Sequence, residues 1–142
     1  MKYITGMQAL NLTCNLETSG DWHQPTFDWS KLEIKNSEDS FFGNYGIYQN
    51  SHIPEHNETF FVANHIRAIL DLIYDKKFAL AQGMRKDFIC NENYTSEIFN
   101  KIYEMRNLKW WKDISSFMEK EYKLDWLHFI MKRDGTNEKM DV

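Results

Sequence analysis

The residues best suited to chemistry form one short string, Gly20-Asp21-Trp22-His23. A carboxylate and an imidazole can form an acid–base pair in which the carboxylate orients the ring. Asp21 and His23 would point to the same side of the chain only in an extended segment, because side chains alternate along a strand. Catalysis would also need a nucleophile or a metal, and Cys14, Thr18 and Ser19 precede the string.

The same string is compatible with two other interpretations. It could be a structural turn, in which Gly20 allows the backbone conformation, Asp21 bonds nearby amides and Trp22 packs into the core. It could also be a contact for a partner protein. The three alternatives stay open at this point, and an enzyme is the least favoured of them.

Metal and cofactor chemistry is not expected. His52 and His56 have the four-residue spacing of two ligands on one helix face, but Pro54 between them indicates a loop. The two cysteines, Cys14 and Cys90, do not form a CxxC motif, and we expect both to be thiols. No glycine-rich phosphate loop or nucleophile elbow is present in the sequence.

Composition indicates a folded domain. The chain has 142 residues, of which 42% are apolar and 15% aromatic, and this excludes global disorder. No apolar run approaches the length that crosses a bilayer, and the opening residues lack the apolar segment of a signal peptide. We therefore expect a cytoplasmic protein without membrane contact.

Charge narrows the partners. The net charge is −4, and residues 1–74 carry four basic and nine acidic groups. Nucleic-acid affinity depends mainly on basic groups that neutralise phosphates, so nucleic acid is not the favoured partner. An acidic surface suits a basic protein partner, because complementary charge steers the encounter.

Residues 1–58 are rich in turn-forming and aromatic residues, which predicts short strands and loops. Residues 31–35 alternate between charged and apolar, and residues 41–49 are aromatic-rich, so the two segments predict a hairpin around the turn at 36–40. Residues 3–12 fit either a helical turn or a strand.

Residues 59–133 are predicted to be helical. Asn57 is the expected N-cap of the most strongly patterned helix, which ends near Tyr74. Arg67 and Asp71 lie on its polar face, where an exposed ion pair is worth a few tenths of a kcal/mol. Further helices are expected at 77–82, after Thr95, around 110–122 and at 124–131. The prediction is a single α+β domain, a small N-terminal antiparallel sheet packed on four or five C-terminal helices, with a frayed tail at 134–142.

Aromatic residues recur at helical spacing near the C-terminus: Trp110, Trp111, Phe117, Tyr122, Trp126 and Phe129. Such a series is expected mainly in a core. It could also stack the bases of a single-stranded nucleic acid, because lysines lie beside the rings.

The helix at residues 61–74 resembles a helix of AbiEi-type antitoxins, the partners of nucleotidyltransferase-like toxins in abortive-infection systems. The residues that match that family's pattern are Ala68, Leu70, Asp71, Leu72 and Tyr74. This resemblance implies a phage-defence or toxin-antitoxin function. That family usually has an N-terminal winged helix for operator binding, but residues 1–58 show no such pattern, so DNA-binding autoregulation is not expected.

A longer similarity relates the chain to a small group of uncharacterised prokaryotic proteins. It is carried by Tyr3-Ile4-Thr5-Gly6, residues 9–12, Cys14, Gly20-Asp21-Trp22-His23, Phe42-Gly43, Asn64-His65-Ile66-Arg67, Gln82-Gly83-Met84 and Asp87-Phe88-Ile89-Cys90. These proteins are associated with the same defence neighbourhoods, and the resemblance implies no established activity.

The first functional hypothesis is therefore an antitoxin-like protein that binds and neutralises a nucleotidyltransferase-like toxin. Its expected contacts are Asp21, Trp22, His23 and Arg67, with charge and exposed aromatics supplying the interface. The alternatives are a small hydrolase or transferase acting on nucleotides, with Asp21 and His23 as its acid–base pair, and a single-stranded nucleic-acid binder. The oligomeric state is not predicted.

Overall fold

The structure is a computed structural model that describes residues 1–21 and 26–140, with the side chains of residues 136–140 left out. The chain divides into two compact units, unit 1 (Met1–Glu92) and unit 2 (Asn93–Val142). This division falls well after residue 58, where the composition of the sequence changes. No helix within the described residues is both long enough and apolar enough to cross a membrane.

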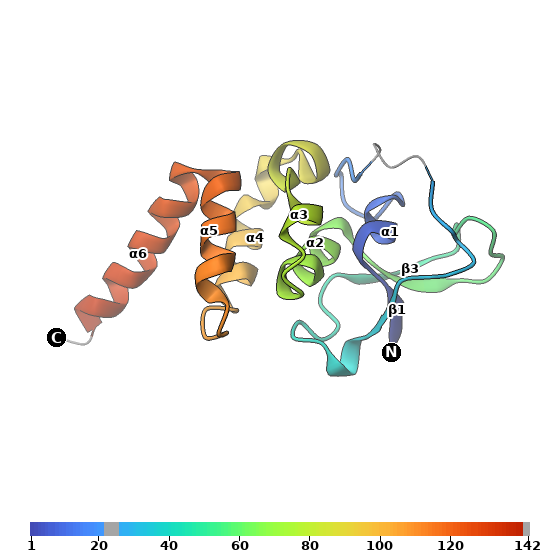
Figure 1. The fold of residues 1–142 in the computed structure, drawn as a ribbon, viewed down its shortest axis with the longest axis horizontal. Coiled ribbons are helices and arrows are strands. Elements are labelled where there is room, and N and C mark those ends of the chain that lie inside the picture. The colour runs from blue at the N-terminus through green and yellow to red at the C-terminus, as the bar shows by residue number, and fades with distance from the viewer. Residues whose placement is uncertain (22–25, 141–142) are drawn as a thin grey trace. The chain divides into compact units, whose positions relative to one another are not determined.

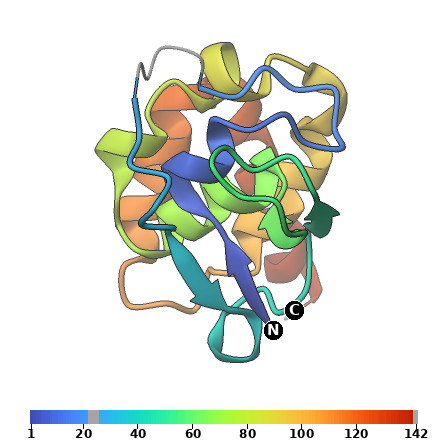
Figure 2. The ribbon, with the colours of Figure 1, turned by 90° about the vertical axis from the view of Figure 1, so that its right-hand side faces the viewer.

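Unit 1 contains a four-stranded mixed sheet in the order β2-β1-β4-β3. Figure 1 labels β1 and β3 of this sheet. The central strand β1 (Lys2–Ile4) pairs antiparallel with β2 (Ile34–Asn36), and Figure 2 shows these two strands side by side. On its other edge β1 runs parallel to β4 (Phe60–Ala63), which pairs antiparallel with β3 (Ile47–Asn50). The sheet and the helices confirm the α+β class, but the sheet is mixed and not antiparallel as predicted, because β1 and β4 run parallel.

The predicted hairpin between residues 31–35 and 41–49 is wrong, because β2 and β3 lie at opposite edges of the sheet. Both are edge strands that pair with the two apolar central strands instead of with each other. Ile4 of β1 and Val62 of β4 are opposite one another and fully buried, so the central pair supplies the core-facing surface. The short helix η1 (Ser37–Asp39) follows β2 directly.

The ambiguous segment at residues 3–12 contains both predicted structures. It begins in β1 and continues into helix α1 (Gly6–Leu10), in which every residue is buried. The polar side chain of Gln8 is satisfied there, because its amide donates to the Lys31 carbonyl at 3.1 Å and accepts from the Glu33 backbone at 2.6 Å.

The central helix of unit 1 is α2 (His65–Tyr74). Its N-cap is Asn64, whose side chain accepts from the Arg67 backbone N–H at 2.9 Å, so the predicted cap at Asn57 is wrong. Residues 60–63, whose apolar pattern resembles a helix, form β4 instead. All residues from His65 to Ile73 are buried, and α2 packs on α1, β4, α3 (Phe78–Ala81) and a π-helical segment, η2 (Met84–Ile89).

Unit 2 is helical. After η3 (Glu92–Tyr94), which spans the division between the units, it contains α4 (Thr95–Tyr103), α5 (Trp111–Tyr122) and α6 (Leu124–Met140). Helix α6 is longer than predicted and continues past residue 134. Tyr103 donates to the Asp134 carboxylate at 3.3 Å, and Arg133 stacks on Phe129, so side-chain contacts support this extension.

Three of the six residues in the C-terminal aromatic series lie in the core of unit 2, and the other three, Trp110, Trp111 and Phe129, are partly exposed. Trp126 is fully buried, its ring centroid lies 5.1 Å from that of Phe99, and its indole N–H donates to Ser115 at 3.1 Å. Phe117 and Tyr122 are buried as well. The predicted core role is confirmed for these rings, which are therefore not exposed for stacking on bases.

Candidate functional site

The string at residues 20–23 is only partly described, because Trp22 and His23 lie outside the described residues. Asp21 is 5% exposed, and its backbone N–H donates to the Leu10 carbonyl at 2.7 Å. The Gly20 N–H donates to the Phe88 carbonyl, also at 2.7 Å. These bonds fix the start of the string to the end of α1 and to η2.

Gly20 is required by close packing. Its φ is +73°, a left-handed conformation that favours glycine. A Cβ at this position would lie 2.3 Å from the Leu10 carbonyl oxygen and 2.9 Å from Cε1 of His65. The left-handed backbone at Gly20 brings the chain against the ring of His65, and the turn interpretation of residues 20–23 stays a prediction because Trp22 and His23 lie outside the described residues.

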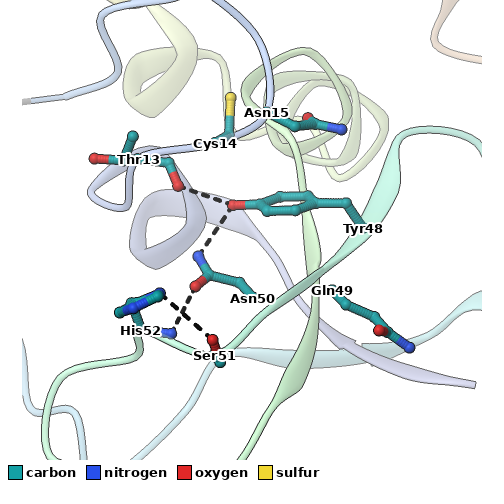
Figure 3. Close-up of a pocket in the computed structure, with 8 residues that line it drawn as sticks. All are labelled: Thr13, Cys14, Asn15, Tyr48, Gln49, Asn50, Ser51 and His52. Carbon is teal, nitrogen blue, oxygen red and sulfur yellow. Dashed lines mark hydrogen bonds between the residues drawn. The ribbon is translucent and has the colours of Figure 1, made fainter.

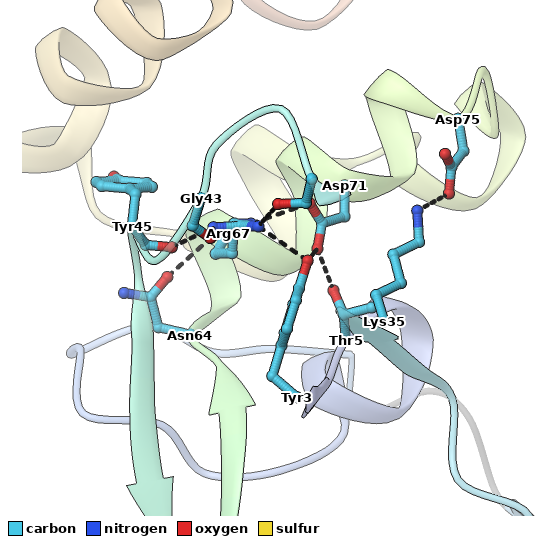
Figure 4. A network of polar contacts seen from close by, with 10 residues as sticks. Tyr3, Thr5, Lys35, Gly43, Tyr45, Asn64, Arg67, Asp71 and Asp75 are labelled. Atoms are coloured by element: carbon cyan, nitrogen blue, oxygen red, sulfur yellow. Dashed lines mark hydrogen bonds and ion pairs between the residues drawn. The ribbon is translucent and has the colours of Figure 1, made fainter. Parts of the chain in front are cut away.

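The structure corrects the expectation for Arg67, which has no exposed surface and cannot contact a partner directly. It lies in a buried polar network (Figure 4). Its five N–H groups donate to Asp71 Oδ1 (2.9 Å), the carbonyls of Gly43 (2.8 Å) and Tyr45 (2.6 Å), Tyr3 Oη (2.8 Å) and Ser40 Oγ. The guanidinium therefore ties the loop at residues 40–45 to α2 and β1.

Asp71 completes this network. Its Oδ2 accepts from the Tyr3 hydroxyl at 2.7 Å and from the Thr5 hydroxyl at 2.6 Å, while Oδ1 accepts from Arg67. Burial and the neighbouring Asp71 charge raise the pKa of Tyr3 to about 12. The ion pair predicted on the helix surface is therefore an interior one, and its role is to hold three segments together.

A second cluster, which we call the Cys14 cluster, consists of Cys14, Thr18 and His65. The Cys14 sulfur lies 3.4 Å from the Thr18 hydroxyl oxygen, which lies 2.6 Å from Nδ1 of His65. Nε2 of His65 lies 2.7 Å from the Leu12 carbonyl oxygen. Because a carbonyl only accepts, Nε2 carries a proton, and Nδ1 of the neutral ring accepts from Thr18.

The electrostatics of the Cys14 cluster favour a thiolate. Burial raises the pKa of Cys14, but hydrogen bonding to His65 and Thr18 and the charge of His65 outweigh it, so that the pKa is lowered to about 7. The backbone of His65, at the first turn of α2, acts in the same direction. Helix N-termini and nearby imidazolium groups are known to activate thiols in this way.

Two cavities flank the Cys14 cluster, and Thr13 lines both of them. The smaller, about 230 Å³, is lined by Thr18, His65 and Asp21 among others. The larger, about 650 Å³, is lined by Thr13, Cys14, Asn15, Tyr48, Gln49, Asn50, Ser51 and His52 (Figure 3). Its wall is fixed by the Tyr48 hydroxyl, which donates to the Thr13 carbonyl at 3.0 Å.

Among the described residues, the other histidines do not gather into a site. Nε2 of His56 lies 2.7 Å from the Trp29 carbonyl, and Nδ1 lies 3.3 Å from Glu58. In the described parts of the chain, no three His, Cys, Asp or Glu side chains are grouped so that they could hold a metal ion.

The sequence did not predict the Cys14 cluster, because its members come from a loop and from the first residue of a helix, and Thr18 and His65 are 47 positions apart in the chain. One available signal was His65 itself, a polar residue at the start of a strongly apolar helix. The pairing depends on how residues 11–21 fold over that helix end, and no local pattern encodes this.

Comparisons of the chain with known protein families, with curated proteins and with solved structures found no match in any of the three. The resemblance to AbiEi-type antitoxins therefore stays a prediction.

Proposed function

We propose that the chain is an antitoxin-like protein that binds and neutralises a nucleotidyltransferase-like toxin, and that unit 1 provides the contact surface. The observation that carries this proposal is an exposed aromatic ring beside exposed carboxylates. Phe41 is 42% exposed, and Glu38 and Asp39 precede it and are exposed as well. We call these three residues the acidic–aromatic loop.

The charge of unit 1 supports a basic partner. Unit 1 carries eight basic and twelve acidic groups, a net charge of −4, whereas unit 2 carries nine of each. A nucleotide- or RNA-binding cleft is basic, because it must neutralise phosphates. Negative charge on the antitoxin would steer the encounter with such a cleft and occupy it.

Phe41 has the surroundings of an interface anchor. Its ring contacts those of Phe42 and Tyr74, with centroids 4.9 and 5.6 Å away. Together with Asp39 and Tyr74 it lines a cavity of about 160 Å³. Buried aromatic anchors that fit pockets commonly carry much of the binding energy of an interface.

Arg67 has an indirect role in this proposal. Its guanidinium lies 5.7 Å from the centroid of Phe42 and bonds the carbonyls of Gly43 and Tyr45. The buried network thus holds the backbone that follows Phe41, so that the ring is presented from an ordered loop. Preorganisation of this kind reduces the entropy lost on binding.

The test is co-expression with a nucleotidyltransferase-like toxin encoded beside the gene of this chain. The chain should restore growth and co-purify with the toxin. Glu38→Lys with Asp39→Lys should abolish rescue, and Phe41→Ala should weaken binding at least about tenfold. The matched control is Glu55→Lys with Glu58→Lys, which changes the net charge equally at two other exposed sites of unit 1.

Undiminished toxicity together with no complex for the unmodified chain would refute the proposal. Equal loss of rescue in the test and control pairs would show that net charge alone matters, and would refute the acidic–aromatic loop as the contact. Circular dichroism of each variant would confirm that the fold is retained.

A further inference from the structure

The Cys14 cluster has the arrangement of an activated nucleophile. A thiol, a relaying hydroxyl and an imidazole follow one another at 3.4 and 2.6 Å, and the Leu12 carbonyl orients the imidazole from its far side. A nucleophile within reach of a base that a third group orients is the general pattern of such sites. The backbone bonds from Asp21 to Leu10 and from Gly20 to Phe88 also anchor the end of this loop.

The hydrogen bonds define a path for the proton. In the neutral state the Cys14 thiol donates to Thr18, and Thr18 donates to Nδ1 of His65. Moving one proton along each bond gives a Cys14 thiolate and a His65 imidazolium, with every donor still paired. The Leu16 backbone N–H, 3.4 Å from the sulfur, also donates to the thiolate.

Other titratable groups line the two cavities beside the Cys14 cluster. Tyr48 of β3 and His52 line the larger cavity, and Asp21 lines the smaller cavity together with His65. Burial raises the pKa of Tyr48, and a charge on Cys14 raises it further, so Tyr48 stays neutral and does not compete for the role of thiolate.

We propose that Cys14 is a thiol-exchange site that forms a mixed disulfide with a small, polar disulfide. Cys14 passes its proton through Thr18 to His65, and the thiolate attacks one sulfur of the disulfide. The bond from Cys14 to that sulfur forms as the original S–S bond breaks, and the departing thiolate takes the proton from His65. Cys14 is oxidised, and the small disulfide is reduced to one thiol.

The larger cavity indicates the class of disulfide. Its lining includes neutral hydrogen-bonding side chains, the amides of Asn15 and Gln49 and the hydroxyls of Thr13 and Ser51, whereas the Asn50 amide is bonded to Tyr48 and to the His52 backbone. Such groups suit the amides and carboxylates of a peptide-like disulfide better than an apolar one. Cys14 itself is half-buried, so the reagent must be small. This inference does not depend on the proposed toxin partner.

The probe is oxidised glutathione applied to the full chain, with peptide mapping to follow mixed disulfides at Cys14 and at the exposed Cys90 separately. The reference is an unstructured cysteine peptide with a pKa of about 8.5. The expected rates follow from the fraction of each thiol that is ionised and from a Brønsted coefficient of about 0.45, which makes the thiolate of lower pKa the weaker nucleophile. Cys14 should therefore react about fivefold faster than the peptide at about pH 6.5, and about twofold slower at about pH 8.5.

Two variants test the relay. Thr18→Val removes the hydroxyl and should return the rate at low pH toward that of the peptide, whereas Thr18→Ser should retain most of the advantage. A Cys14 profile that parallels the peptide at every pH, or no modification of Cys14 at all, would overturn the proposal. Undiminished reactivity of a folded Thr18→Val chain would overturn the relay. If Thr18→Val does not fold, the pH profile of the unmodified chain still decides whether Cys14 is a thiol-exchange site.

Discussion

The buried ion pair between Arg67 and Asp71 gives the sharpest prediction about stability. Arg67→Met removes a guanidinium that has no exposed surface and leaves the Asp71 carboxylate in the interior without its countercharge. It also deprives the carbonyls of Gly43 and Tyr45 of their donor. Breaking a buried pair from one side costs about 3–5 kcal/mol, so we expect a loss of that size in the free energy of unfolding.

The assay is urea unfolding followed by circular dichroism, with Lys35→Met as the matched control. Lys35 pairs with Asp75 in the same unit, but both side chains are about a third exposed, and removing such a pair costs at most about 1 kcal/mol. Arg67→Lys keeps the charge but loses the planar fork, and should cost about 1–3 kcal/mol.

A loss below about 1 kcal/mol for Arg67→Met would refute the reasoning, because that is the value of an exposed pair. Failure of Arg67→Met to fold would be consistent with the larger cost, and Arg67→Lys would then supply the measurement. The combination of Arg67→Met with Asp71→Leu should cost less than the sum of the single changes, because no uncompensated charge remains.

Three other predictions concern stability. Burial and Asp71 raise the pKa of Tyr3 to about 12, so the folded chain holds the Tyr3 proton more tightly than the unfolded chain does. The resulting stabilisation is complete below about pH 10, and the free energy of unfolding should fall by about 1.4 kcal/mol per pH unit from there to pH 12. Tyr3→Phe should remove this slope from unfolding measured at alkaline pH. Gly20→Ala should cost at least about 1 kcal/mol more than Gly43→Ala in urea unfolding, because both sites have positive φ but an added Cβ meets close atoms only at Gly20. Trp126→Ala should destabilise unit 2 by about 3–5 kcal/mol, and a change within about 1 kcal/mol would contradict its fully buried position.

Local patterns predicted much of the fold. The apolar spacing along residues 66–73 identified α2, and the aromatic series identified the core of unit 2. The start of α2 was misplaced because residues 60–63 continue the apolar pattern, although they pair with Ile4 and with β3. Strand pairing depends on segments far apart in the chain, so the order of the sheet could not be obtained from local alternation.

The candidate site was harder to predict for the same reason. Arg67 and Asp71 have the spacing of a surface pair, and only the arrival of Tyr3 and the loop at residues 40–45 buries them. Likewise Cys14 and His65 meet because a loop closes over the first turn of α2. In both cases the decisive contacts join parts of the chain that no short motif connects.

The measurement that tests the central claim most directly is the rate at which the purified chain associates with the toxin at increasing salt. Electrostatic steering by the acidic surface of unit 1 predicts fast association at low ionic strength and a fall of at least about tenfold at high ionic strength. Reversing charge at Glu38 and Asp39 should remove most of this salt dependence. An association rate that does not change with salt, or the absence of any complex, would contradict the account.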